Sequence, residues 1–278
     1  MIRLIALDMD GTLLIHGVAG IPERNAQVLR QAAQQGVQLA LCTGRTTEDA
    51  SFFASDAGLD MRILGLNGGY CLDAPHGSCS ADHPMTEAQA RALARMMAAF
   101  PTLQCGLFGG EELVLNLPRE VGIDWGTHLA RAGAKTVVNR EMAGLEHLLA
   151  RGVNKLVAIR LQADGELERL RDMIAVELPG LDISSSWDNN IEVMPHGVNK
   201  GMALAELAGR LGIPREQVMA IGDHDNDVSM LRWAGCGIAM ANGSPAALAA
   251  ADDVTLSNDR LGVAEAVKRH VLQGGTAA

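Results

Sequence analysis

Short apolar runs that end in polar or glycine-rich loops recur along this chain and alternate with longer amphipathic stretches. The first three runs cover residues 2–7, 37–41 and 63–66. Apolar strands that alternate with helices are typical of βα units around a parallel sheet that is buried on both faces. We therefore predict an α/β fold with a doubly wound, Rossmann-like parallel sheet, in which a ligand binds beyond the carboxyl ends of the strands.

A different texture interrupts this pattern after about residue 82. Thr86 and Gln89 have the spacing of a capping box that opens an Ala-rich helix. Strand-like pieces and helical stretches then alternate, at 113–117, 136–138 and 155–162 and at 141–150 and 166–178. The first texture returns after Ile191. We predict that residues 1–82 and 190–278 form one core domain and that residues 83–189 form an inserted α+β domain.

Charge and composition exclude several kinds of partner. The 278 residues carry a formal net charge of −10, and aromatic residues make up 3%. Such a chain repels a nucleic-acid backbone and has few rings for base stacking, so we expect no nucleic-acid partner. No apolar run approaches the roughly 20 residues that span a bilayer, and charged side chains occur by Arg3, so we expect neither a membrane span nor a signal peptide. Five scattered cysteines without a C-x-x-C pair fit a cytoplasmic location.

The segment Asp8-Met9-Asp10-Gly11-Thr12 places two carboxylates two positions apart at the end of a very apolar strand. Side chains at this spacing tend to lie on one side of the local backbone, so both can face one ligand. Burying two such charges is costly unless a cation or a shared proton compensates them. An ordinary turn remains an alternative, but Gly11 favours a phosphate ligand because it lets backbone amides approach an anion closely.

A second acidic cluster, Gly222-Asp223-His224-Asp225-Asn226-Asp227, also follows an apolar run. A solvated acidic turn or a calcium site would use similar residues, but the spacing and the distal Glu of an EF-hand loop are missing. Mg²⁺ prefers few carboxylates, several waters and a substrate phosphate. We therefore predict a Mg²⁺ site where Asp8, Asp10 and Asp223 converge from two strand ends.

Two smaller signals supply donors for a phosphate group. Thr43-Gly44-Arg45 ends a strand with a hydroxyl, a flexible amide and a cation, and Asn199-Lys200-Gly201 places a lysine at the expected start of a helix. Each signal is weak alone, since a surface lysine is the simpler reading of the second. Together they provide the hydrogen-bond donors that a bound phosphate needs.

Taken in chain order, four segments resemble the four ordered motifs of the haloacid dehalogenase superfamily: Asp8-x-Asp10-Gly11-Thr12, Thr43-Gly44-Arg45, Lys200-Gly201 and Gly222-Asp223-x-x-Asn226-Asp227. Other segments resemble its Cof-type branch, which has a large class IIB cap between the second and third motifs: Asn67-Gly68-Gly69, Glu192-Val193-Met194-Pro195, Gly237-Ile238-Ala239-Met240 and Asn258-Asp259. The resemblance spans the expected core, and it implies that residues 83–189 are the cap that determines substrate specificity. Ala241-Asn242-Gly243-Ser244 departs from the Gly-Asn-Ala that the family often has after the last of these strands.

The resemblance implies a mechanism for phosphate ester hydrolysis. Asp8 is the nucleophile and forms an aspartyl-phosphate. Asp10 protonates the leaving oxygen and later deprotonates the attacking water. Mg²⁺ is bound by the Asp8 carboxylate, the Asp10 backbone carbonyl and Asp223, and it offsets the repulsion between the nucleophile and the phosphate.

The remaining motif residues are assigned to the phosphate and its surroundings. Thr43 and Lys200 bind the phosphoryl oxygens as charge redistributes, and Asn226 lies beside them. Asp227 orients Lys200 or belongs to the surroundings of the metal. Further substrate contacts are expected from Gly44, Arg45, Asn67 and Gly68.

The natural substrate is not encoded in any readable pattern of the cap. The resemblance implies a small phosphorylated metabolite such as a sugar phosphate, pyridoxal phosphate or FMN. A sugar phosphomutase on the same scaffold and a non-catalytic phosphometabolite-binding regulator are the alternatives. Trp125, Trp187 and Met194 either line the pocket at the cap or pack in the core. We expect a monomer or a small homo-oligomer.

Overall fold

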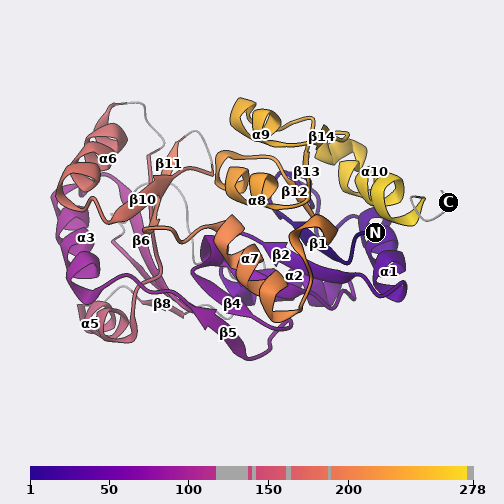
Figure 1. The fold of residues 1–278 in the computed structure, drawn as a ribbon. Helices are drawn as coiled ribbons and strands as arrows, with labels where there is room; N and C mark the ends of the chain where they lie inside the picture. The colour runs from indigo at the N-terminus through magenta and orange to yellow at the C-terminus, as the bar shows by residue number, and fades with distance from the viewer. Residues whose placement is uncertain (117–136, 140–141, 161–163, 187–188, 274–278) are drawn as a thin grey trace.

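The computed structural model describes residues 1–116, 137–139, 142–160, 164–186 and 189–273. They form two β-sheets with helices packed on them (Figure 1). The larger sheet has the strand order β14-β13-β12-β1-β2-β3-β4-β5, and the smaller has the order β10-β11-β9-β6-β7-β8. The predicted α/β class is confirmed. Among the described residues, no helix is both long and apolar enough to cross a membrane.

The larger sheet is parallel from β14 to β3 and continues as an antiparallel hairpin of β4 and β5. Its strands are β1 (Leu4–Leu7), β2 (Gln38–Cys42), β3 (Arg62–Gly65), β4 (Tyr70–Leu72), β5 (Cys79–Asp82), β12 (Val218–Gly222), β13 (Cys236–Ala239) and β14 (Asp253–Val254). β1 lies in the middle, between β2 and β12, and is buried along its whole length. The apolar runs of the sequence are therefore the central strands, as predicted.

Helices cover both faces of this sheet, because successive side chains of a strand point to opposite faces. Ile5 and Leu7 pack against α1 (Glu23–Gln34), α2 (Thr47–Asp56) and α10 (Gly262–Val267). Leu4 and Ala6 pack against α7 (Lys200–Arg210), α8 (Val228–Trp233) and α9 (Pro245–Ala250). The sheet is thus doubly wound, which confirms the predicted fold class.

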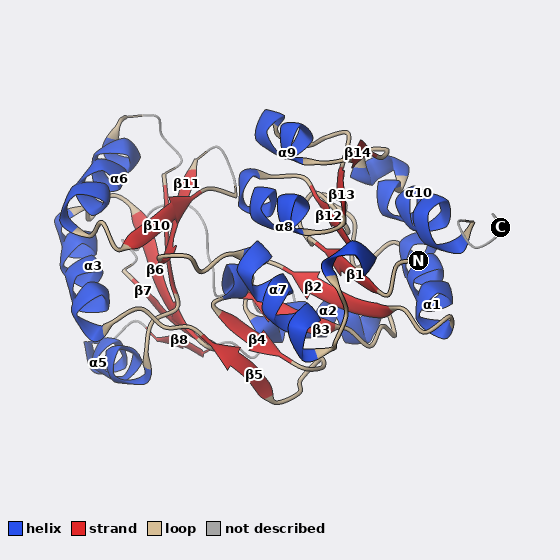
Figure 2. Cartoon of the chain, in the orientation of Figure 1, coloured by secondary structure: helices blue, strands red, loops and turns tan. Residues whose placement is uncertain are grey.

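The described helices of the smaller sheet cover one of its faces. Its strands are β6 (Gln104–Gly109), β7 (Glu112–Leu115), β8 (Val137–Asn139), β9 (Lys155–Ile159), β10 (Leu181–Ser184) and β11 (Asn190–Pro195). Its described helices are α3 (Glu87–Ala99), α5 (Met142–Arg151) and α6 (Glu166–Glu177). They lie on the side away from the larger sheet (Figure 2). Thr86 and Gln89 form the predicted capping box at the start of α3.

Sheet pairing bears on the predicted division into domains. β5 ends at Asp82 in the larger sheet, where the first boundary is predicted. β11 pairs with β9 and β10, so residues 190–195 belong to the smaller sheet and not to the core to which we assigned them. We propose that the inserted cap runs from residue 83 to Pro195, since the chain then continues into α7, which packs against the larger sheet.

Candidate active site

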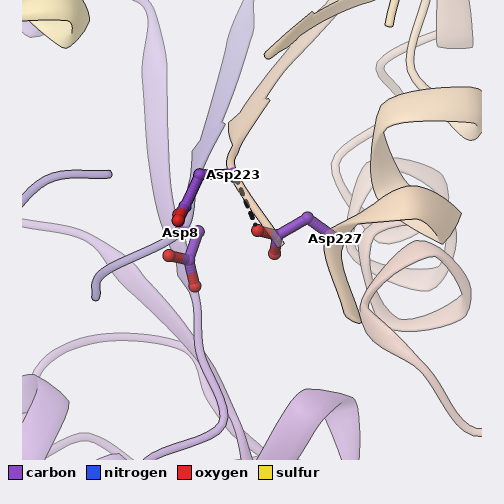
Figure 3. A group of neighbouring side chains, drawn as sticks. All are labelled: Asp8, Asp223 and Asp227. Carbon is purple, nitrogen blue, oxygen red and sulfur yellow. Dashed lines mark hydrogen bonds between the residues drawn. The ribbon is translucent and has the colours of Figure 1, made fainter. Parts of the chain in front are cut away.

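Two neighbouring strands of the larger sheet end in the predicted carboxylates. β1 and β12 are parallel and in register, with Leu7 opposite Ile221, so Asp8 and Asp223 follow at the same edge. Asp227 comes from the loop after β12. Carboxylate oxygens of these three residues lie within 4.8 Å of one another. Figure 3 shows the three side chains beside one another, with Asp227 approaching from the side opposite Asp8 and Asp223.

Lys200 is the cation at the centre of this cluster. It is the first residue of α7, which begins there because the Asn199 side chain accepts a hydrogen bond from the backbone N–H of Met202. Its Nζ donates to Asp8 Oδ1 at 2.6 Å and to Asp227 Oδ1 at 2.5 Å, and its side chain is fully buried. Burial opposes the charge, but the two carboxylates outweigh it and raise the pKa of Lys200.

Asp227 binds both the lysine and its own loop. While Oδ1 accepts from Lys200, Oδ2 accepts from the backbone N–H groups of Asp223 at 2.8 Å and His224 at 3.0 Å. Figure 3 shows the first of these backbone contacts as a dashed line. Of the two roles predicted for Asp227, this geometry favours that of orienting Lys200.

Negative charge exceeds positive charge at this strand edge. Burial and the neighbouring Asp227 raise the pKa of Asp8, although Lys200 opposes them. Burial and Asp227 also raise the pKa of Asp223 to about 6, although Thr12 Oγ1 donates to Asp223 Oδ1 at 2.6 Å. Carboxylate oxygens with excess negative charge are the donors that Mg²⁺ prefers. The residues present therefore fit the predicted metal.

Gly11 is required for the close approach of the two acidic loops. Its φ is +83°, and a Cβ at this position would lie 2.3 Å from Asp223 Oδ2. Any other residue would strain the backbone and displace the Asp223 carboxylate. Gly11 thus lies close to Asp223, and the predicted approach of its loop to a phosphate stays a prediction.

Asp10 lies beside the cluster, at the rim of the site. Arg45 binds it with a bidentate fork, Nε to Oδ2 at 2.7 Å and a terminal nitrogen to Oδ1 at 2.6 Å. The other terminal nitrogen of Arg45 donates to Asp49 Oδ2 at 2.7 Å. The Asp10 side chain is 45% exposed, whereas that of Arg45 is 19% exposed. Arg45, predicted as a substrate contact, thus also holds Asp10 in place.

A cleft opens beside these residues. The larger sheet and its loops contribute Asp8, Asp10, Thr43, Gly44, Arg45, Thr46, Asp49, His224 and Asn226. The smaller sheet and its connections contribute Phe108, Lys155, Val157, Ile159, Ser186, Asn190 and Glu192. The mixture of a polar floor and an apolar wall is typical of small-molecule sites.

Other predicted residues lie behind this lining. Lys200, Asp223 and Asp227 are not among the described lining residues, but Lys200 joins Asp227 to Asp8, which is one of them. Asn67, at φ +55°, donates to Glu192 Oε2 at 2.5 Å and accepts from Asn226 Nδ2 at 3.2 Å. A Cβ on Gly68 would lie 2.7 Å from Ala203 Cβ, so this glycine lets its loop pack on α7. Among the described lining residues, neither Asn67 nor Gly68 is present.

Some residues of the cleft were not predicted from the sequence. Lys155 and Phe108 carry no motif, and Glu192 is part of a quoted segment without an assigned role. For Lys155 the sequence offers one sign of a buried role, its place at the start of an apolar run, and a surface lysine would fit that pattern equally well. Met194 is buried in β11 outside the described lining, and Trp125 and Trp187 lie outside the described residues.

Comparison with known proteins identifies relatives along the whole chain. It is 29% identical over 277 residues to the 5-amino-6-(5-phospho-D-ribitylamino)uracil phosphatase YcsE of Bacillus subtilis, covering 98% of this chain and 96% of the relative. It is 29% identical over 275 residues to the pyridoxal phosphate phosphatase YbhA of Escherichia coli, covering 97% and 99%. The named relatives confirm the predicted enzyme class, a phosphatase.

Solved structures give the same result for the fold. A haloacid dehalogenase-like hydrolase from Bacteroides thetaiotaomicron superposes with a TM-score of 0.81 at 28% identity, covering 97% of this chain and 99% of the other. The family model described as haloacid dehalogenase-like hydrolase matches residues 5–267. The chain therefore belongs to the haloacid dehalogenase-like hydrolase family, as its ordered motifs had indicated.

Proposed function

We propose that this chain is a Mg²⁺-dependent phosphomonoester hydrolase that transfers the phosphate of a small metabolite to Asp8 and then to water. The observation that carries the proposal is the network in which Lys200 joins Asp8 to Asp227, beside Asp223 and at the floor of the cleft. Such an arrangement fixes a carboxylate nucleophile and keeps a cation where phosphoryl charge develops.

In the first step, a carboxylate oxygen of Asp8 attacks phosphorus, and the bond from phosphorus to the ester oxygen breaks. The product is an aspartyl-phosphate, which water then hydrolyses to regenerate the carboxylate. Lys200 holds Asp8 Oδ1, which leaves Oδ2 as the attacking oxygen. The same lysine neutralises part of the charge that the incoming phosphate adds.

Asp10 is the proposed general acid and base. It would give a proton to the departing ester oxygen and take one from the attacking water, a role worth about 10²–10⁴-fold. Both of its carboxylate oxygens accept from Arg45 in this structure. Protonation of Asp10 therefore requires that one of these hydrogen bonds be exchanged when substrate enters.

Mg²⁺ would be held by the carboxylates of Asp8 and Asp223 together with the backbone carbonyl of Asp10. When bound, it supplies positive charge that offsets the repulsion between Asp8 and the phosphate. The hydroxyl of Thr43 and the amide of Asn226 lie at the cleft and are the proposed donors to the phosphoryl oxygens.

The wall of the cleft favours a leaving group with an apolar or flat part. Phe108, Val157 and Ile159 face the cleft from β6 and β9, and they form one apolar cluster with Leu66. The names of the two relatives give a phosphorylated uracil derivative and pyridoxal phosphate, both of which contain a ring. We infer that pyridoxal phosphate or an FMN-like ester is a better substrate than a plain sugar phosphate. A cytoplasmic location and a monomer or small homo-oligomer remain predictions.

The test is phosphate release from a panel of phosphomonoesters, with and without Mg²⁺, by the native protein and by Asp8→Asn. We expect Mg²⁺-dependent turnover that the substitution abolishes, and a covalent phosphate on Asp8 that is trapped by acid quenching. Turnover that survives the substitution would exclude Asp8 as the nucleophile. Turnover only with a sugar bisphosphate would indicate a mutase, and no turnover by either protein would favour a binding regulator.

A further inference from the structure

A buried ion pair lies on the face of the smaller sheet that is turned toward the cleft. Lys155 begins β9, and Glu192 lies on the neighbouring antiparallel strand β11, diagonally across from it. Lys155 Nζ and Glu192 Oε1 are 2.6 Å apart, and the two side chains are 2% and 4% exposed. The established motifs of the core assign neither residue a role.

Lys155 reaches across to the loop that carries Thr43. Its Nζ donates to the carbonyl oxygen of Gly44 at 3.0 Å. The N–H of the same peptide group, which belongs to Arg45, donates to Thr43 Oγ1 at 3.2 Å. One peptide plane therefore connects the cap lysine to the hydroxyl proposed to bind phosphate. Rotation of that plane would turn the Arg45 N–H away from Thr43 Oγ1 and remove the hydrogen bond that orients the hydroxyl.

Glu192 makes a matching connection to two other loops of the core. Its Oε2 accepts from Asn67 Nδ2, and Asn67 Oδ1 in turn accepts from Asn226 Nδ2. Asn226 lies in the cleft and is a second proposed phosphate donor. Ser186 Oγ donates to Glu192 Oε1 at 2.9 Å and completes the surroundings of the carboxylate.

Burial of this ion pair costs folding free energy, because both charges lose their hydration. Burial lowers the pKa of Lys155 against the pull of Glu192, whereas Lys155 and the hydrogen bonds from Asn67 and Ser186 lower the pKa of Glu192 against its burial. Two apolar side chains would fill the same space without the desolvation penalty. The apolar alternative would leave the Gly44 carbonyl and the Asn67 amide without these partners.

We propose that Lys155 and Glu192 are positioning residues for catalysis, which set the geometry of the phosphate-binding loops from the cap side. Lys155 aligns Thr43 through the Gly44–Arg45 peptide, and Glu192 aligns Asn226 through Asn67. The inference rests on the proposed function, because it assigns both loops to the phosphate. If the inference holds, Thr43 and Asn226 are correctly placed for phosphate only when the cap is in contact with the core.

The experiment compares Lys155→Met, Glu192→Gln and the double variant Lys155→Met/Glu192→Met, with p-nitrophenyl phosphate and Mg²⁺. Each single variant is expected to lower kcat by about 10²-fold with a smaller change in KM, the size of loss that follows misplacement of about 1 Å. The double variant removes both buried charges, so its Tm should rise above that of Lys155→Met. Its kcat should nevertheless stay as low.

A matched control separates positioning from attachment of the cap. Asn154, the neighbour of Lys155, donates to Gly69 O at 2.8 Å and to Asp82 Oδ1 at 2.7 Å but does not line the described cleft. Asn154→Ala should lower the Tm with little change in kcat. If Lys155→Met has native kcat, or if the double variant recovers kcat along with Tm, the pair only packs and the inference is wrong.

A second readout does not depend on turnover. The Kd of inorganic phosphate, measured by calorimetry with Mg²⁺ present, should rise at least tenfold in Lys155→Met and in the double variant but not in Asn154→Ala. If the native protein shows no turnover, the proposed reaction fails, and this comparison still tests the positioning role. Equal phosphate affinity in all four proteins would overturn the inference.

Discussion

Two lysines, one on each side of the cleft, are the largest fully buried side chains among the described residues. Lys200 lies in the core between two carboxylates, Asp8 and Asp227, which raise its pKa. Lys155 lies in the cap with one carboxylate, Glu192, and its pKa is lowered because burial prevails. The number of carboxylates around each lysine accounts for the opposite directions.

The difference separates two uses of a buried cation. Lys200 touches the proposed nucleophile, so its charge acts on the reacting atoms. Lys155 instead donates to a backbone carbonyl, so its contribution is the orientation of a loop. We expect loss of the first to remove the chemical step, and loss of the second to leave a slower but intact reaction. The following predictions test this division.

Lys200→Met should have the largest effect. It removes the cation beside the phosphate, and we expect kcat to fall about 10³-fold or more. Asp8 and Asp227 would be left as uncompensated buried charges, so the free energy of unfolding should fall by about 3–5 kcal/mol. Single-turnover kinetics and urea unfolding measure the two effects. If Lys155→Met slows the reaction as much as Lys200→Met, the division between the two lysines is wrong.

Gly11→Ala should have an intermediate effect, confined to the core side. The new Cβ would displace the Asp223 carboxylate, and we expect the affinity for Mg²⁺ to fall about 10–100-fold, as for changes that reorient metal ligands. A Mg²⁺ titration of the rate measures this. Gly17→Ala is the control, because Gly17 has a similar φ of +78° with nothing within 4 Å of its Cβ position. Equal behaviour of the two variants would mean that backbone strain, not displacement of Asp223, is responsible.

Glu111→Gln should have the smallest effect, on stability and not on rate. Glu111 lies between β6 and β7 and accepts from the backbone N–H of Glu48 at the start of α2. Burial raises its pKa to about 7. Between about pH 4.5 and 7 the folded state therefore binds more protons than the unfolded state, and stability falls as the pH rises.

The glutamine variant should remove this dependence, because its side chain does not titrate. In the native chain we expect the free energy of unfolding to fall by about 1–2 kcal/mol across this pH range, a small value because the carboxyl is partly hydrated. Urea unfolding at pH 5 and pH 8 measures it. The native chain should lose more stability than the variant between these two values, while kcat at pH 7 is unchanged. An unchanged slope in the variant would mean that Glu111 is not the group responsible for it, and a lowered kcat would show that this cap contact affects catalysis.

The core strands and their acidic ends could be predicted from the sequence, because each is marked by a short local pattern. Each apolar run forms a central strand, and the polar residues that follow lie together because parallel neighbours end at one edge. The pairing of Leu7 with Ile221 is enough to bring Asp8 to Asp223. The hairpin of β4 and β5 was not predicted, since β5 is short and partly exposed and has no apolar pattern.

The cap contacts to the site could not be predicted from the sequence, because they join residues that lie far apart along the chain. The partners Lys155 and Gly44 are 111 residues apart, and Asn67 and Glu192 are 125 residues apart. Neither contact follows from spacing, since both require the register of β9 against β11 and the approach of the whole sheet to the core. We propose a later second cap boundary for the same reason, since the pairing of β11 with β9 and β10 does not follow from spacing.

The central place of β1 also determines when the site is completed. Asp8 is made early, but its partner Lys200 lies 192 residues later, and β12 later still. At about 5–20 residues per second, roughly ten to forty seconds of synthesis separate the two ends of the site. The cap is continuous in sequence and emerges within that interval. A nascent chain therefore carries the proposed nucleophile long before Lys200 and the strand β12 are made, and we expect hydrolysis only after β12 has paired with β1.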